Sequence, residues 1–265
     1  MAGRRCAVKP ISAPDRAGVL AGRYRAGVLD PDIIMLKKIY LLIISIVISL
    51  FILSLSIAVP ISVRGLYYSQ IDKLNLVEET GYSEETIRGA FDEMMDYCTK
   101  GGPNSGLEFG TGELKWSQSG KEHFDDVARL FSLDKGILAA SAIGLLLFIA
   151  FEFFVKKPEE GPREPAILAL GRGPFFWGPA GLLAALALIG GYATLDFDKF
   201  FVTFHHVFFP GKDNWIFYED LDEIIKILPQ QVFSNFALVI GIAGLGLCVV
   251  SILIDFLLNK GKGRD

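Results

Sequence analysis

The chain contains three histidines, and two of them stand side by side in a run rich in phenylalanine. The doublet His205–His206 lies in "FFVTFHHVFFPGKDNW" (200–215), and His123 lies far upstream in "KEHFDDV". With an ordinary pKa of about 6.5, imidazole is the side chain best suited to acid and base catalysis at neutral pH. The first question is therefore whether two of these rings belong to one site.

Helical periodicity separates the two rings of the doublet. Five phenylalanines recur at the spacing of one helix face: Phe197, Phe200, Phe201, Phe204 and Phe208. On this helix His206 lies opposite the phenylalanine face, whereas His205 lies about a quarter turn from its centre. We therefore predict that His205 faces the buried side and that His206 faces water or headgroups.

An amphipathic helix of this kind, placed directly after an apolar run, is typical of the membrane interface. Such helices bury their apolar face about 5–10 Å into the headgroup and acyl boundary, where lipid ester carbonyls lie. The alternative is a packing helix whose aromatic rings fill gaps between membrane spans.

The third histidine is predicted on a helix over about 119–133. There His123 shares an apolar face with Val127 and Leu130, within about 60° on the helical wheel. Asp126, three residues on, could hold one ring nitrogen and fix the tautomer. The alternative is a partly buried histidine whose ring bonds a backbone carbonyl.

Two imidazoles at the depth of lipid esters suit acyl transfer. One ring would take a proton from the attacking group, and the other would donate to the oxyanion or the leaving oxygen. Zinc is the competing hypothesis, because four acids lie near the histidines: Asp125, Asp126, Asp213 and Asp222. We predict no metal site, since neither the H-E-x-x-H motif nor paired-cysteine spacing is present. The sequence also lacks a G-x-S-x-G elbow and a glycine-rich phosphate loop.

Four long apolar runs must position these residues. Hydrophobic residues make up 51% of the chain and its mean hydropathy is +0.41. Each run approaches or exceeds the roughly 20 residues that cross a bilayer. The sequence thus predicts an all-α polytopic membrane protein with transmembrane helices at 35–60, 136–155, 175–195 and 233–258. The first run could be a signal peptide, but its apolar core exceeds the usual length of about 7–15 residues, which favours a retained helix.

The connecting segments have opposite charge. Residues 1–38, 156–172 and 259–265 hold fifteen Lys and Arg against seven acids, whereas residues 61–135 and 196–232 hold eleven against twenty-one. The positive-inside rule therefore predicts cytoplasmic termini and two acidic loops outside. The net charge of −4 averages these populations and gives no indication of nucleic-acid binding.

These boundaries divide the chain into membrane and loop segments. Between the spans we predict an extracytoplasmic cap at 61–135, a cytoplasmic loop at 156–174, an extracytoplasmic interfacial loop at 196–232 and a cytoplasmic tail at 259–265. Residues 1–34 read as a disordered tail or a mis-assigned start, since "MLKK" at Met35 would open an inside-anchored helix.

The cap is predicted to be mostly helical. Ser83 followed by two acids marks a helix start, and "GGP" at 101–103 marks its end. Leu107 to Trp116 alternate around "GTG" and suggest a short β-hairpin. Cys98 has no partner for a disulfide outside; it is a packing residue or, alternatively, a nucleophile.

Two acids lie near the predicted cytoplasmic ends of the spans, at Glu152 and Asp255. The basic residues that follow them could neutralise or hydrate these carboxylates. A proton relay needs ionisable groups near the bilayer midplane, so this placement argues against an ion-coupled transporter.

The order of the motifs resembles one family. "MMDYC", "QSGKEHFDDV", a pair of spans, "FHHVFFPGKDNW" and "IIKILPQQVF" follow one another as in the bacterial lipoprotein intramolecular transacylases, which are four-span proteins. The resemblance covers about residues 35–258. Phe124, Ala128 and the extra His206 depart from the family pattern, which leaves open a paralogue acting on another lipid ester.

The resemblance implies a reaction and a site. The family moves an acyl chain from the glycerol ester to the α-amine of a diacylglyceryl-cysteine lipoprotein, without a cofactor, using two histidines at the outer surface of the cell membrane. By motif, these are His123 and His205. We expect His205 to deprotonate the amine, and His123, oriented by Asp126, to donate to the oxyanion and then to the glycerol oxygen. Supporting residues are Asp126, Tyr97, Asn214 and Trp215. The expected partners are a diacylglyceryl-modified lipoprotein and membrane lipid, and not nucleic acid.

A second function remains open from the sequence alone. The acidic cap could bind another protein, and the chain would then be a non-enzymatic membrane sensor or assembly protein. That hypothesis predicts two imidazoles far apart and a phenylalanine face packed inside a protein interface.

Overall fold

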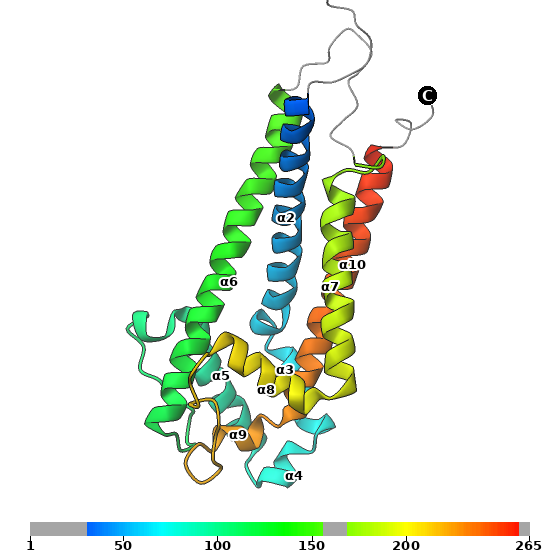
Figure 1. The fold of residues 1–265 in the computed structure, drawn as a ribbon. Helices are drawn as coiled ribbons and strands as arrows, with labels where there is room; N and C mark the ends of the chain where they lie inside the picture. Colours follow the sequence, from blue (N-terminus) through cyan, green and yellow to red (C-terminus); the bar gives the residue numbers. More distant parts are fainter. Residues whose placement is uncertain (1–30, 156–168, 260–265) are drawn as a thin grey trace, which may run out of the picture.

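A bundle of four long helices carries a smaller helical cap at one end (Figure 1). The computed structural model describes residues 31–155 and 169–259; the predictions for residues 1–30, 156–168 and 260–265 lie outside this range. Along the chain the elements are α2 (Pro31–Ser62), α3 (Gly65–Lys73), α4 (Leu76–Thr80), α5 (Glu84–Lys100), η1 (Gly102–Asn104), α6 (Gln118–Ala150), η2 (Phe151–Val155), α7 (Pro174–Leu195), α8 (Phe197–Phe208), α9 (Ile224–Ile227) and α10 (Gln230–Leu258).

Four of these helices are long and apolar enough to cross a membrane: Ile34–Ser62, Gln118–Phe154, Pro174–Leu195 and Gln230–Leu258. Within the described residues there is no β-sheet, and the predicted all-α polytopic fold is confirmed. The 37 residues of Gln118–Phe154 would extend about 55 Å at 1.5 Å per residue, well beyond a bilayer core of about 30 Å. Its polar first half, 118–135, therefore projects beyond the core and reaches the cap.

Helix α2 lies at the centre of the bundle and packs against α6, α7 and α10. Its buried isoleucines recur every fourth residue, at Ile44, Ile48 and Ile52, and form a core with Cys248 of α10. Helix α7 lies very close to α2 at Gly178, where an added Cβ would lie 2.4 Å from the Ser45 carbonyl oxygen. The first apolar run is thus part of the packed bundle, as expected of a retained span.

The cap has its own hydrophobic core, built from α3, α5, α9 and the start of α6. Tyr67 stacks on Phe91 with ring centroids 3.7 Å apart, and its hydroxyl donates to the Ile227 carbonyl oxygen at 2.8 Å. Helix α5 begins as predicted, since the Ser83 side chain accepts a hydrogen bond from the Thr86 N–H. It also ends as predicted, at Gly101, whose φ of +114° suits glycine.

The predicted β-hairpin at 107–116 is wrong. The segment forms only an isolated bridge between Thr111 and Glu113, and of its four apolar residues Leu107 and Trp116 stay exposed. Two of its backbone donors bond other segments: the Gly112 N–H donates to Glu93, and the Lys115 N–H donates to Glu223. These partners on α5 and on the second outer loop satisfy the backbone groups that a hairpin ladder would have used.

The expectation that Asp255 is hydrated is also wrong, and the basic residues expected to neutralise it lie outside the described residues. Asp255 is 1% exposed, and its carboxylate accepts a hydrogen bond from the Gly173 N–H at 3.0 Å. Gly173 precedes α7, so the carboxylate of α10 caps the free N–H groups at the start of a neighbouring span.

Candidate active site

Both outer segments take part in placing His123. The helix that carries it, α6, starts at a Ser117 cap whose hydroxyl accepts from the Gly120 N–H at 2.9 Å. Asp222, from the second outer loop, accepts from the Ser117 N–H at 2.7 Å and from its hydroxyl at 2.9 Å. Gly120 is required here, because an added Cβ would lie 2.2 Å from Asp222 Oδ1. The first turns of α6 are therefore tied to the loop that follows α8.

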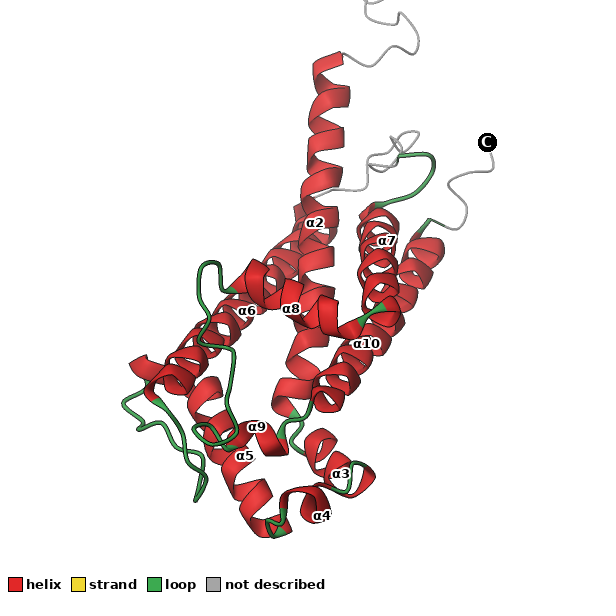
Figure 2. Ribbon diagram, turned by 60° about the horizontal axis from the view of Figure 1, so that its bottom comes forward, coloured by secondary structure: helices red, strands yellow, loops and turns green. Residues whose placement is uncertain are grey.

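His205 is placed by α8, which lies across the long helices from the end of α7 towards α6 (Figures 1 and 2). The helix starts at Asp196, whose side chain accepts from the Lys199 N–H at 3.0 Å, and it ends before Phe209. Along α8, His205 is buried and His206 is exposed, so the two rings of the doublet are separated as the periodicity indicated. Phe204 and Phe208 remain 39% and 49% exposed, which fits a lipid-facing side.

The two imidazoles meet although 82 positions separate them in the sequence. The ring centroids of His123 and His205 are 5.8 Å apart with 36° between the planes, and each residue is 7% exposed. Phe209 packs against both rings, at 4.9 and 5.8 Å, and Phe217 meets the edge of His123 at 5.5 Å. Trp215 stacks on His205 at 4.6 Å with 26° between the planes. Aromatic walls thus surround a pair of rings that are close enough to act on one reacting group.

Burial makes both rings neutral at physiological pH. The pKa of His123 is lowered to about 4, chiefly by loss of hydration and also by the neighbouring His205, while Asp126 opposes the change. Burial also lowers the pKa of His205, against a hydrogen bond to the Phe201 carbonyl that raises it. A buried imidazole loses the water that would stabilise its charged form.

These lowered pKa values predict that the protein loses stability in acid. Unfolded His123 takes up a proton at about pH 6.5, whereas folded His123 does so only near pH 4. Between these values the unfolded state binds more protons, so the free energy of unfolding falls as the pH is lowered, by about 3 kcal/mol for this one group. Chemical unfolding in detergent micelles at several pH values should show that His123→Gln reduces this acid loss. The matched control is His206→Gln, which alters an exposed ring on α8 and should keep the wild-type pH dependence; equal slopes for all three proteins would contradict the linkage.

The surroundings of the two rings favour different tautomers. Nδ1 of His205 lies 2.7 Å from the Phe201 carbonyl oxygen, so Nδ1 carries the proton and Nε2 keeps a free lone pair. Nδ1 of His123 is buried and has no partner among the described residues. A buried N–H without an acceptor costs more than an unshared lone pair, so the proton of His123 resides on Nε2. One ring thus offers an acceptor and the other a donor.

Comparison with known proteins shows which family has this architecture. The family described as lipoprotein intramolecular transacylase Lit matches residues 42–233, well over half of the chain. The chain belongs to the Lit family. Members are acyltransferases, so the chain is an enzyme, and the alternative of a non-enzymatic sensor or assembly protein is wrong.

Solved Lit structures share the fold. The in meso structure of the membrane-integral transacylase Lit from Bacillus cereus superposes with a TM-score of 0.73 at 22% identity, over 87% of this chain and 99% of that one. Two structures of the same protein with one histidine replaced, by arginine or by alanine, each give a TM-score of 0.68 at 22% identity; they cover 86% and 87% of this chain, and 94% and 97% of those chains. The comparison with curated proteins gave no match.

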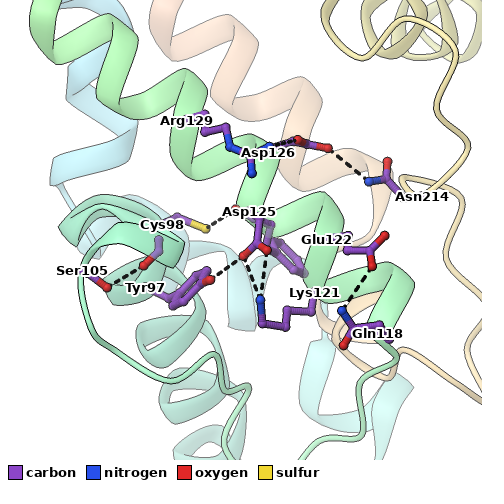
Figure 3. Close-up of polar contacts among 12 residues, drawn as sticks. Tyr97, Cys98, Ser105, Gln118, Lys121, Glu122, Asp125, Asp126, Arg129 and Asn214 are labelled. Carbon is purple, nitrogen blue, oxygen red and sulfur yellow. Dashed lines mark hydrogen bonds and ion pairs between the residues drawn. The ribbon is translucent and has the colours of Figure 1, made fainter.

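Contrary to the prediction, Asp126 does not bind His123 in this Lit fold. Its carboxylate accepts hydrogen bonds from Arg129 at 2.6 Å and from Asn214 Nδ2 at 3.2 Å (Figure 3). It also accepts from Lys212 Nζ at 2.6 and 2.7 Å. Burial would raise the pKa of Asp126, but the hydrogen bonds of Lys212 and Asn214 outweigh it and lower the pKa below its usual range. The spacing of three residues correctly placed Asp126 beside His123, but the cation that binds it comes from the other loop.

Lys212 is the site residue that sequence reasoning missed. It lies in the quoted motif "PGKDNW" between Gly211 and Asn214, and its role shows only when this segment is seen against α6. Its position two residues before Asn214, one of the predicted supporting residues, was the available signal. Asn214 bonds Asp126, and Trp215 stacks on His205.

Tyr97 lies on a different side of α6. It is 2% exposed and its hydroxyl donates to Asp125, which also binds Lys121 at 2.9 Å (Figure 3). No contact between Tyr97 and either imidazole is present in the described structure, so Tyr97 joins α5 to α6. Its neighbour Cys98 is 1% exposed, its thiol contacts the Phe124 carbonyl oxygen at 3.8 Å, and burial raises its pKa to about 12. Cys98 is therefore a packing residue and not a nucleophile.

A polar cavity of about 370 Å³ lies around the carboxylate of Asp126. Its walls are Glu122, Asp125, Asp126, Arg129, Lys212, Asp213 and Asn214. Glu122 and Asp126 flank His123 in the sequence of α6, so the cavity opens on the polar face of the helix that carries this ring. Over residues 31–155 and 169–259, no group of three His, Cys, Asp or Glu is arranged to hold a metal ion.

Proposed function

We propose that this transacylase moves an acyl chain within a diacylglyceryl-cysteine lipoprotein, from a glycerol ester to the α-amine of the cysteine, with His205 as base and His123 as oxyanion donor. The observation that carries this assignment is the pair of neutral rings, 5.8 Å apart, with complementary tautomers. Amine and ester belong to one substrate, so the enzyme has to orient them and move one proton.

His205 is the base because its Nε2 is the free lone pair. The Nδ1–H bond to Phe201 and the stacked Trp215 hold the ring in one orientation. As the amine nitrogen attacks the ester carbonyl carbon, Nε2 takes the proton that the nitrogen loses. When the bond between the carbonyl carbon and the glycerol oxygen breaks, the same ring returns this proton to the glycerol oxygen. The amide N–acyl bond forms, the ester bond breaks, and no atom enters or leaves.

His123 stabilises the tetrahedral intermediate. Its lowered pKa keeps it neutral, so it has no surplus proton to transfer, and its Nε2–H donates a hydrogen bond to the oxyanion. This differs in one step from the expectation from the sequence, in which His123 also protonated the glycerol oxygen. A neutral imidazole is a suitable donor here because the charge that it must balance exists only in the intermediate.

The surroundings of the pair support a lipoprotein substrate at the membrane surface. The exposed Phe204 and Phe208 of α8 would lie among acyl chains, whereas the 370 Å³ polar cavity would receive the hydrated polypeptide side of the cysteine. The acidic loops lie at one end of the bundle, and the basic segments attach at the other, which supports a site on the outer face with both termini in the cytoplasm.

The reaction leaves the mass of the lipoprotein unchanged, so the test must locate the acyl group by fragmenting the lipopeptide in a mass spectrometer. We expect that a bacterium with diacylglyceryl lipoproteins but no N-acylating enzyme, once it expresses this chain, makes lipopeptides of unchanged mass whose fragments carry one acyl group on the cysteine nitrogen. The same lipopeptides should stop reacting with amine-specific reagents. Lipopeptides that keep two glycerol esters and a free amine, despite verified expression in the membrane, would contradict the proposed function.

A further inference from the structure

One buried carboxylate joins the two segments that carry the histidines. Asp126 follows His123 by one helical turn on α6 and is 7% exposed. Two of its partners, Lys212 and Asn214, belong to the segment 209–215 that follows α8; Figure 3 shows the contact with Asn214. A buried carboxylate needs close partners, and these two come from the segment, so the contact joins the segment to α6.

The same segment supports the ring of His205. Lys212 is held at both ends, because its ammonium binds Asp126 and its carbonyl oxygen accepts from Trp215 Nε1 at 2.9 Å. The indole of Trp215 in turn stacks on His205 with centroids 4.6 Å apart. A continuous series of contacts thus runs from Asp126 through Lys212 and Trp215 to the imidazole, and its start lies one turn from the other imidazole.

We propose that Asp126 is a positioning residue for His205: through Lys212 and Trp215 it sets the plane of the base and its distance from His123. Asp126 therefore acts on His205, which belongs to the other outer segment, and not on His123, its neighbour on α6. This inference rests on the proposed role of His205 as base. Misplacement of a catalytic group by about 1 Å can reduce a rate about 100-fold, so a contact of this kind affects turnover although it touches no reacting atom.

Kinetics of purified variants in lipid vesicles separate positioning from substrate binding. For Asp126→Ala and Asp126→Asn we expect kcat to fall about 10- to 100-fold with KM nearly unchanged, because the substrate site remains while the base is misaligned. Asp126→Glu keeps the charge and should recover much of the rate. The control is Asp220→Asn, which removes an exposed acid from the same loop and should behave as wild type. A raised KM with unchanged kcat would overturn the proposal in favour of substrate binding by Asp126.

The fluorescence of Trp215 reports directly on its stacking with His205. The chain has three tryptophans, and Trp116→Phe with Trp177→Phe leaves Trp215 alone. A protonated imidazole quenches the fluorescence of a stacked indole, so the Trp215 emission should fall as the pH is lowered. Adding His205→Ala or His206→Ala to this double variant shows which imidazole causes the quenching. We expect Asp126→Ala to remove at least half of the His205-dependent change, and Asp220→Asn to keep it.

The two proposals fail by different results. Full activity of His205→Ala would overturn the proposed function and the catalytic side of this inference, whatever Trp215 reports. An unchanged Trp215 titration in Asp126→Ala would overturn the positioning role alone, even with reduced activity. Lower thermal stability of Asp126→Ala with normal kcat per folded molecule and an intact Trp215 signal would mean that Asp126 only stabilises the cap, and would equally overturn it.

Discussion

Replacing His205 by alanine is expected to abolish N-acylation, with a loss of about 10²- to 10⁴-fold in kcat, because the proposed base for the amine proton is removed. No other imidazole can take over: His206 is exposed on α8, and His123 presents a protonated Nε2. The measurement is the rate of appearance of the N-acyl cysteine fragment from a diacylglyceryl lipopeptide in vesicles.

Two further variants separate the chemistry of His205 from its packing. His205→Asn can keep an N–H near the position of Nδ1, and with it the hydrogen bond to the Phe201 carbonyl, but it lacks a base at Nε2. We expect it to be as inactive as the alanine variant, although better folded. His206→Ala, the matched change one position along, should retain most of the activity. If the His205 variants keep as much activity as His206→Ala, then α8 supplies no base.

The second large effect concerns the oxyanion. His123→Ala removes the proposed Nε2–H donor, and loss of one such donor typically lowers kcat about 10²- to 10³-fold. His123→Gln places an amide N–H near the position of Nε2 and cannot carry a proton between atoms. Because His123 is proposed as a neutral donor, glutamine should recover about tenfold or more of the loss.

The same substitution at the other ring supplies the control. His205→Gln exchanges a lone pair for a donor and should remain as inactive as His205→Ala. If glutamine fails equally at both positions, His123 must transfer a proton, and the assignment of donor and base would have to be revised. If glutamine works equally at both positions, neither ring is a base.

Much of the architecture follows from apolar periodicity. Four runs of sufficient length can be hidden only in a bilayer, and the repeat of Phe197, Phe200, Phe201 and Phe204 determines which side of α8 is apolar. The same repeat separates His205 from His206, because the direction of a side chain on a helix depends only on its position. The Ser83 cap and the glycine end of α5 are likewise local, since their hydrogen bonds join residues three or four apart.

Periodicity does not say which element meets an apolar face, or which group satisfies a buried charge. Helical spacing pairs Asp126 with the nearest ring, yet its cation, Lys212, comes from 86 positions along the chain. The alternation at 107–116 suggests a hairpin, yet Glu93 and Glu223 take the backbone donors. Asp255 is expected near water and instead caps α7.

The sequence by itself determined the membrane class, the helices and the faces on which His123 and His205 lie, because these depend on neighbours within one or two turns. Only the tertiary structure decided that the two rings face each other, which nitrogen of each carries the proton, and that Asp126 holds the second loop against the first. Each of these depends on a contact between segments far apart in the chain, and such contacts are set by how whole helices pack.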